Sequence, residues 1–206
     1  MCSENFTQLL ARSAAAHSQL CPRQVLGVRM GLLAGVSLGI DLPQIAKILY
    51  TIVESDGCLV DGIAAATNCS PGRRTLRVID YGKVAATFID TRNESACRIT
   101  PKPTARIDAS QFAPEARDAW HAMLLGYARM PDTQLLNIQA VQVCLPIQEL
   151  TGKLGHRVHC EWCGEEIMNG REIVRQGNTY CRGCASVSYY ASVQETAPSP
   201  LTFPFE

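Results

Sequence analysis

The chain has 206 residues, enough for one domain with a hydrophobic core and a small appended module. Hydrophobic residues make up 47% of the chain, which excludes an intrinsically disordered protein. The 19 basic and 19 acidic side chains cancel, and this zero net charge argues against a nucleic-acid-binding protein.

The N-terminal residues do not combine a basic segment with an apolar run, so no signal peptide is expected. The longest apolar stretch, Val25 to Ile40, is interrupted by Arg29 and is too short to cross a bilayer. These features predict a cytoplasmic protein without a membrane anchor. Because cytosolic thiols stay reduced, the ten cysteines are expected to be metal ligands, reactive thiols or core residues rather than disulfides.

Apolar spacing and turn residues predict helices interleaved with strands, and hence an α+β layer fold. The predicted helices lie within residues 4–20, from Pro22 to about Leu38, from Leu59 to Asn68 and from Pro114 to Met130. The predicted strands lie within Ile45–Val53, Leu76–Ile79, Val84–Asp90, Cys97–Thr100 and Asn137–Cys144. The short turns between the three middle strands suit a meander.

Composition divides the chain into three parts. We expect an α+β core over residues 1–150, a zinc ribbon over 156–190 and a Pro-rich tail over 191–206.

Four cysteines in the ribbon have the spacing of a zinc site. They form two C-x2-C pairs, Cys160 with Cys163 and Cys181 with Cys184. Four thiolates supply a complete tetrahedral shell for structural zinc. The ribbon carries equal numbers of basic and acidic side chains, so a stabilising or partner-docking role is favoured over nucleic-acid binding.

A second group of possible ligands lies near the N-terminus. Cys21 precedes Pro22, which makes it the expected N-cap of a helix, and Cys58 opens a later helix. His17 lies one turn before Cys21. Helix N-termini favour thiolate, so the three residues suggest a soft-metal or nucleophile site. The alternative is that these cysteines fill the core.

Three further residues are candidates for a pocket beside that site. Asp61 shares a helix face with Cys58 and could be a ligand, a ligand's partner or a general base. A straight helix would separate Cys58 from Cys69 by about 16 Å. Cys69 would then line another wall or reach the metal of a second subunit. Arg73, in a turn after Cys69, could contact an anion. The other basic residues of 70–106 are interpreted as solvated strand faces.

Several sequence blocks agree, in order, with one known family. They are His17–Pro22 with Gly27–Gly31, Val53–Asp61, Asn68–Ser70 and Asp80–Phe88. The chain resembles the FmdE family, named for a component of formylmethanofuran dehydrogenase, and the ribbon resembles the C-terminal zinc finger of its longer members. The resemblance implies a mixed sheet in an α+β core, a metal near the Cys/His cluster and a homodimer. Gln19 stands in place of the family's second histidine, which points to a changed metal shell.

The expected function is a metal-binding protein, with zinc in the ribbon and zinc or another soft transition metal held in the core by His17, Cys21 and Cys58. The resemblance implies an accessory to a molybdenum- or tungsten-dependent oxidoreductase, or a role in metal or cofactor handling. Two alternatives stay open: a free-standing metalloenzyme with an open Cys/His metal site, and a ribbon-based interaction or regulatory protein. The sequence does not decide whether the chain is an enzyme.

Overall fold

The computed structural model describes residues 5–15, 17–146, 150 and 155–190. The chain forms two compact units, Met1–Ile147 and Gln148–Glu206. The predicted tail, residues 191–206, lies outside the described residues. Among the described helices, none is long and apolar enough to cross a membrane.

The first unit begins with two helices near their predicted positions. Helix α1 spans Phe6–Ala14, and Asn5 caps it by accepting a hydrogen bond from the Gln8 backbone N–H at 2.9 Å. Helix α2 spans Pro22–Leu38, starts directly after Cys21 and ends at Gly39 in a left-handed conformation. Cys21 is therefore the N-cap, as the sequence predicted.

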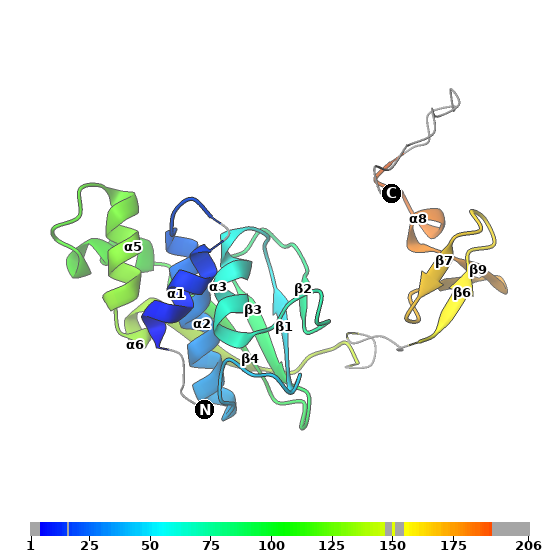
Figure 1. Cartoon of the computed structure of the whole chain (residues 1–206), viewed down its shortest axis with the longest axis horizontal. Coiled ribbons are helices and arrows are strands. Elements are labelled where there is room, and N and C mark those ends of the chain that lie inside the picture. The colour runs from blue at the N-terminus through cyan, green and yellow to red at the C-terminus, as the bar shows by residue number, and fades with distance from the viewer. Residues whose placement is uncertain (1–4, 16, 147–149, 151–154, 191–206) are drawn as a thin grey trace, which may run out of the picture. The chain divides into compact units, whose positions relative to one another are not determined.

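A five-stranded mixed sheet forms the other layer of this unit (Figure 1). Its strands are β1 (Leu49–Val53), β2 (Leu76–Val78), β3 (Ala86–Asp90), β4 (Ala96–Pro101) and β5 (Leu136–Val141). The spatial order is β2-β1-β3-β4-β5, with β1 and β2 parallel and the other neighbours antiparallel. The α+β fold with a mixed sheet is thus confirmed.

The predicted meander is wrong at its first strand. Strand β2 does not pair with β3 but lies beside β1, because helix α3 (Cys58–Thr67) connects β1 to β2 as a crossover. A strand–helix–strand crossover returns the chain in parallel, whereas a short turn would have produced an antiparallel pair. The crossover places the start of α3 just beyond the end of β1.

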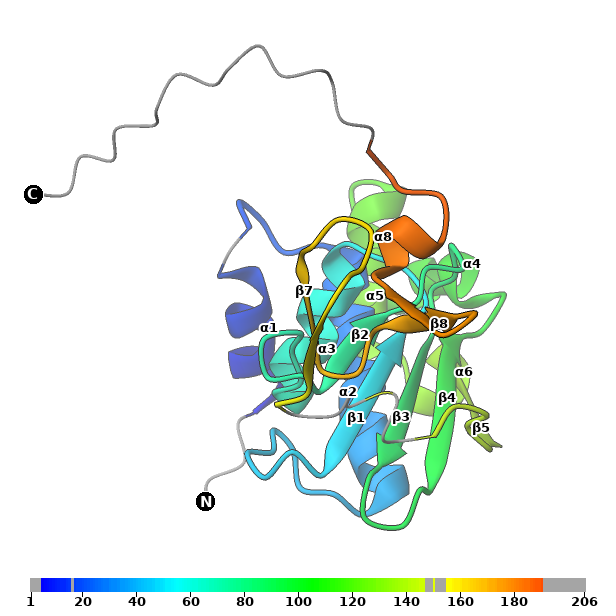
Figure 2. The ribbon, with the colours of Figure 1, turned by 90° about the vertical axis from the view of Figure 1, so that its right-hand side faces the viewer.

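Helices α2 and α3 lie on one face of the sheet and run side by side in the same direction (Figures 1 and 2). Gly27 of α2 faces Gly62 and Ile63 of α3, and Gly31, one turn later, faces Ala66. Because Gly27 and Gly62 are glycines without a side chain, the two helix backbones can approach each other closely. Leu26 and Met30 of α2 then pack into the main core with Phe88 of the sheet.

The segment between β4 and β5 is more broken than predicted. It contains α4 (Ala105–Asp108), a 3-10 helix η1 (Ala109–Phe112), α5 (Ala119–Arg129) and α6 (Asp132–Leu135). Helix α5 begins at Ala119 rather than Pro114, because the Asp118 carboxylate accepts a hydrogen bond from the His121 N–H at 2.7 Å and caps the helix there. Arg29 of α2 donates to the backbone oxygens of Tyr127 and Met130 and fixes the end of α5.

A partly buried ion pair ties Glu54, the residue after β1, to Arg98 of β4 and gives a pH prediction. Arg98 donates to both carboxylate oxygens of Glu54 at 2.5 and 2.7 Å, and Glu54 is 6% exposed. The hydrogen bond from Arg98 lowers the pKa of Glu54 below its ordinary 4.5. A lowered folded-state pKa means that this stabilisation is present above pH 4.5 and is lost as the pH falls through the folded-state value.

Glu54→Gln is therefore expected to lower the free energy of unfolding by about 3 kcal/mol at neutral pH, since it leaves the Arg98 charge without its partner. The difference in unfolding free energy between Glu54→Gln and the parent protein should become smaller as the pH falls below 4.5. Urea denaturation from pH 3 to pH 8 measures both effects. A difference in unfolding free energy that does not change with pH would contradict this role of the carboxylate.

The second unit is built from two small hairpins. Strands β6 (Arg157–His159) and β7 (Glu166–Met168) form one, and β8 (Ile173–Arg175) and β9 (Asn178–Tyr180) form the other. The β8–β9 hairpin lies between the two cysteine pairs. Its two-residue turn has Gln176 and Gly177 at positive φ, which matches the twist of the strands. Helix α8 (Arg182–Ala185) closes the unit.

Candidate metal centre

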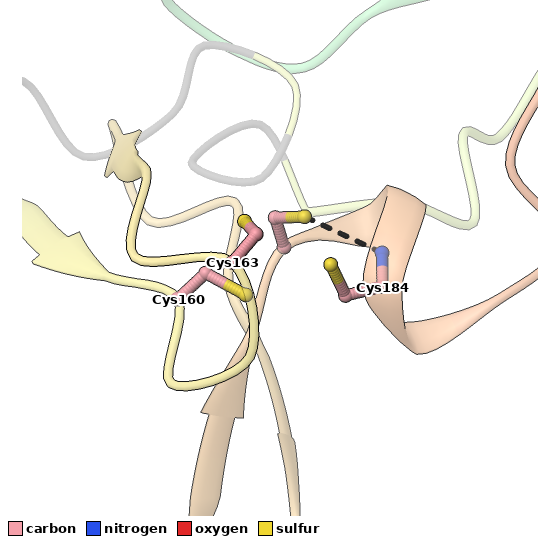
Figure 3. A group of neighbouring side chains, drawn as sticks. Cys160, Cys163 and Cys184 are labelled. Carbon is pink, nitrogen blue, oxygen red and sulfur yellow. Dashed lines mark hydrogen bonds between the residues drawn. The ribbon is translucent and has the colours of Figure 1, made fainter. Parts of the chain in front are cut away.

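The four ribbon cysteines converge in the second unit. Cys160 and Cys163 lie in the turn between β6 and β7, and Cys181 and Cys184 lie at the start of α8. Their four sulfur atoms lie within 4.8 Å of one another, and Figure 3 shows the labelled cysteines meeting across the two elements. Among the residues that the structure describes, no other group of three or more His, Cys, Asp or Glu ligand atoms is this tight.

Backbone donors prepare this cluster for a cation. The N–H groups of Cys163 and Cys181 lower the pKa of the Cys160 thiol to about 6. The neighbouring Cys181 thiol is the main reason that the pKa of Cys184 is raised to about 12. Four crowded sulfurs cannot all ionise without a cation between them, whereas tetrahedral zinc with Zn–S bonds of about 2.3 Å would fit this spacing. The donor set suits structural zinc.

In the first unit, two cysteines meet at the starts of parallel helices. Cys21 caps α2 and Cys58 is the first residue of α3, and the close approach of Gly27 to Gly62 aligns the two helix N-termini. The Cys21 and Cys58 thiols are neighbours that line the same cavity, and a hydrogen bond with Cys21 is the largest cause of the raised pKa of Cys58. The structure thus brings together two of the three residues predicted for the core metal.

The thiolate expectation is wrong for Cys58 in the metal-free protein. Its pKa is raised, first by the hydrogen bond with Cys21, then by burial and by the nearby Asp61 carboxylate. A backbone N–H acts in the opposite direction but is outweighed. A pair of adjacent thiols holds a proton more readily than one isolated thiol, and a bound cation would reverse that balance.

Gln24 positions the Cys21 end of this pair, and sequence reasoning missed it. Its side-chain oxygen accepts a hydrogen bond from the Cys21 N–H at 2.8 Å, and its side-chain nitrogen donates to the Ser13 carbonyl at 2.7 Å. Gln24 is fully buried. An amide side chain three residues after an N-cap cysteine is the signal that could have revealed it.

His17 and Asp61 extend the cluster. His17 Nε2 lies 3.0 Å from Asp61 Oδ2, and both side chains are partly exposed. Since Asp61 also lies near Cys58, the four residues His17, Asp61, Cys58 and Cys21 form a line of neighbours. They do not form a closed shell like that of the ribbon. The thiols and the imidazole are the donor types that zinc and other soft ions prefer.

Cys69 and Arg73 lie apart from this line. Helix α3 runs unbroken from Cys58 to Thr67 and carries Cys69 to its far end, where the fully buried thiol donates to the Leu49 carbonyl at 3.4 Å. Cys69 and Asp61 line a smaller cavity of about 260 Å³. Arg73 is outside both this cavity and the larger one described next, and it donates to the Ile45 carbonyl at 2.7 Å.

A larger cavity, of about 650 Å³, opens beside the thiol pair. It is large enough for a small organic molecule. Its charged, thiol and aromatic lining residues are Cys21, Arg23, Cys58, Lys102, Arg106, Trp120 and Tyr127. Apart from the two cysteines, none of these was a sequence candidate.

Together the two units define a metal-binding protein: a C4-type zinc finger attached to an α+β unit with a paired-thiol site. Residues 16–137 match the family model described as FmdE, Molybdenum formylmethanofuran dehydrogenase operon. That is more than half of the chain, and the chain belongs to the FmdE family. Residues 152–190 match the model of the prokaryotic dksA/traR C4-type zinc finger.

One curated relative and one solved structure extend this comparison. A probable S-adenosyl-L-methionine-binding protein from Archaeoglobus fulgidus is 29% identical over 91% of this chain. The chain spans 55% of the length of that relative. The crystal structure of a tungsten formylmethanofuran dehydrogenase FmdE-like protein from Syntrophus aciditrophicus has a TM-score of 0.58 at 20% identity. The match covers 93% of this chain and 100% of that chain. This likeness supports the fold.

Proposed function

We propose that this chain is a cytoplasmic metal-binding accessory protein with two metal sites of different purpose. The C4 finger holds structural zinc. His17, Cys21 and Cys58 bind zinc or another soft transition metal in the core, next to the 650 Å³ cavity. The observation that carries this proposal is the contact between the Cys21 and Cys58 thiols at one wall of that cavity. Three protein ligands would leave a position open to a molecule in the cavity.

Metal analysis of the purified full-length protein tests the core site. Cys21→Ala is expected to lower the metal content by about one ion per chain, because a three-ligand site does not retain its metal with two ligands. The matched control is Cys144→Ala, which removes an exposed thiol outside both clusters and should leave the metal content unchanged. Metal content that survives Cys21→Ala, with the finger zinc as the internal reference, would refute the core site.

The proposed partner is a molybdenum- or tungsten-dependent oxidoreductase, and the proposed assembly is a homodimer. The description of the family and the tungsten enzyme for which the similar solved protein is named support the partnership. Sedimentation velocity measures the assembly. Affinity capture of the tagged chain, followed by molybdenum and tungsten analysis of the captured proteins, measures the partnership. A monomer in sedimentation velocity would count against the homodimer. Captured proteins that contain neither molybdenum nor tungsten would count against the oxidoreductase partner.

A free-standing metalloenzyme is the second candidate, because the cavity reaches both core thiols directly. An enzyme with an open site should let a molecule in the cavity reach the core thiols. Under that candidate, a molecule that binds in the cavity slows the alkylation of Cys58 in apo protein and leaves the alkylation of the exposed Cys144 unchanged. Alkylation of Cys58 that no cavity ligand slows would favour the accessory role.

A further inference from the structure

All of the charged side chains that line the 650 Å³ cavity are basic. Arg23, Lys102 and Arg106 line it, and no aspartate or glutamate does. Within the described part of the chain, none of these three cations has an ion-pair partner. Other arginines of the same unit, such as Arg29 and Arg98, are paired with carboxylates.

The three cations come from different elements that the fold brings together. Arg23 lies in the first turn of α2, Lys102 directly follows β4, and Arg106 lies on α4. The backbone fixes Lys102, because its N–H donates to the Leu135 carbonyl at 2.9 Å and its carbonyl accepts from the Ala105 N–H at 3.0 Å. Gathering like charges around one cavity opposes folding, and an anion bound among them relieves the repulsion.

Another part of the cavity wall is apolar and aromatic, and it indicates which uncharged group a ligand would carry. Trp120, Met123 and Tyr127 line the cavity from one face of α5, at helical spacing. Tyr127 is 5% exposed, and Arg29 fixes its carbonyl at 2.8 Å. A rigid aromatic wall beside cations suits a flat ring that carries an anionic group.

We propose that the cavity binds an aromatic heterocycle with a phosphate group, the chemistry of a nucleoside monophosphate. The phosphate contacts Arg23, Lys102 and Arg106, and the ring lies against α5. A phosphate matches this wall better than a carboxylate, because it offers more charge and more acceptor oxygens to guanidinium groups. The inference rests on the proposed ligand cavity and names the class of molecule that it takes.

The basic cavity wall should also favour the binding of one kind of adenosine compound over another. S-adenosyl-L-methionine, which the name of the Archaeoglobus relative mentions, carries a sulfonium and an ammonium against one carboxylate. Its net charge is therefore positive, and three unpaired cations repel it. Adenosine monophosphate shares the adenosine and carries the opposite charge. The cavity should prefer the phosphate.

Isothermal titration of the full-length, metal-loaded protein at low salt tests the proposal. The probes are AMP, GMP, CMP and UMP, with adenosine, inorganic phosphate and S-adenosyl-L-methionine as comparisons. We expect at least one nucleoside monophosphate to bind more tightly than its nucleoside, inorganic phosphate or S-adenosyl-L-methionine, and to weaken as salt rises. Lys102→Gln and Arg106→Gln should each weaken it about tenfold, as expected for loss of a hydrogen bond to a charged group.

Arg117→Gln is the matched control, since Arg117 is exposed and lies outside the cavity lining. It should bind like the parent protein. Absence of monophosphate binding, tighter binding of S-adenosyl-L-methionine, or affinity unchanged by Lys102→Gln and Arg106→Gln would overturn the inference. Metal analysis keeps the two proposals apart: a protein without core metal that binds the monophosphate through Lys102 refutes only the core metal site.

Discussion

Replacing Cys163 with serine is expected to remove about one zinc per chain and to unfold the C4 finger, while the α+β unit stays folded. The finger has almost no hydrophobic core, since the buried side chains within residues 155–190 are Cys160, Ile167 and Ala185. Metal binding to such small modules contributes about 10–16 kcal/mol, which is also their folding free energy. Without that contribution the two hairpins have too little buried apolar area to stay ordered.

Hydrogen exchange resolved by segment, together with zinc analysis, measures this outcome. Amides of β6 to β9 should lose their protection in Cys163→Ser, and amides of β1, β3 and β4 should keep theirs. Cys144→Ser is the control, because Cys144 is an exposed thiol outside the finger. A zinc-free variant whose β8–β9 amides stay protected would show that the hairpins fold without the ion.

The zinc finger could be predicted because its ligands lie close together in the sequence, in two short segments. Each C-x2-C pair places two ligands in a single turn, so spacing alone indicates the site. The structure adds how the turns are built: Gly164 adopts a positive φ, and its N–H donates to the Cys160 carbonyl at 2.9 Å. Nothing outside the second unit is needed to bring the four sulfurs together.

The core thiol pair could be predicted only in part. The sequence placed Cys21 and Cys58 at helix starts, which the structure has. Their contact depends on α2 and α3 being parallel and close, which follows from the β1–α3–β2 crossover and from Gly27 and Gly62. Neither is a local property of the chain. The raised pKa of Cys58 follows from the same contact, and an isolated helix start would not predict it.

The 650 Å³ cavity could not be predicted from the sequence. Lys102 and Arg106 fell in a basic stretch interpreted as solvated strand faces, whereas the structure places them on the cavity wall. Their partners in that wall, Arg23 and Trp120, lie far from them in the chain. Only the packing of α2, α4 and α5 at the end of β4 brings the four side chains around one space. Conversely, Arg73, a sequence candidate for anion binding, lies outside this cavity.

Gly62→Ala is expected to lower the free energy of unfolding by about 1–3 kcal/mol, although the same change inside an ordinary helix stabilises by up to about 1 kcal/mol. A methyl group at Gly62 would overlap the Gln24 carbonyl oxygen and would lie 3.0 Å from the Gly27 Cα. Both obstacles are backbone atoms of α2, so no side-chain rotation relieves them. The two helices must move apart to accept the methyl group.

That movement connects stability with the proposed core metal site, because Cys21 and Cys58 meet only while α2 and α3 stay close. If that site binds a metal, Gly62→Ala should also lower the core metal content, with the finger zinc unchanged as the internal reference. Gly72→Ala is the matched control, since a methyl group there meets no atom within 4 Å. Urea denaturation and metal analysis of both variants give the two readouts. A stabilised Gly62→Ala protein would mean that the close helix contact does not exist in solution. A destabilised one that keeps its core metal would mean that the metal does not depend on the paired thiols.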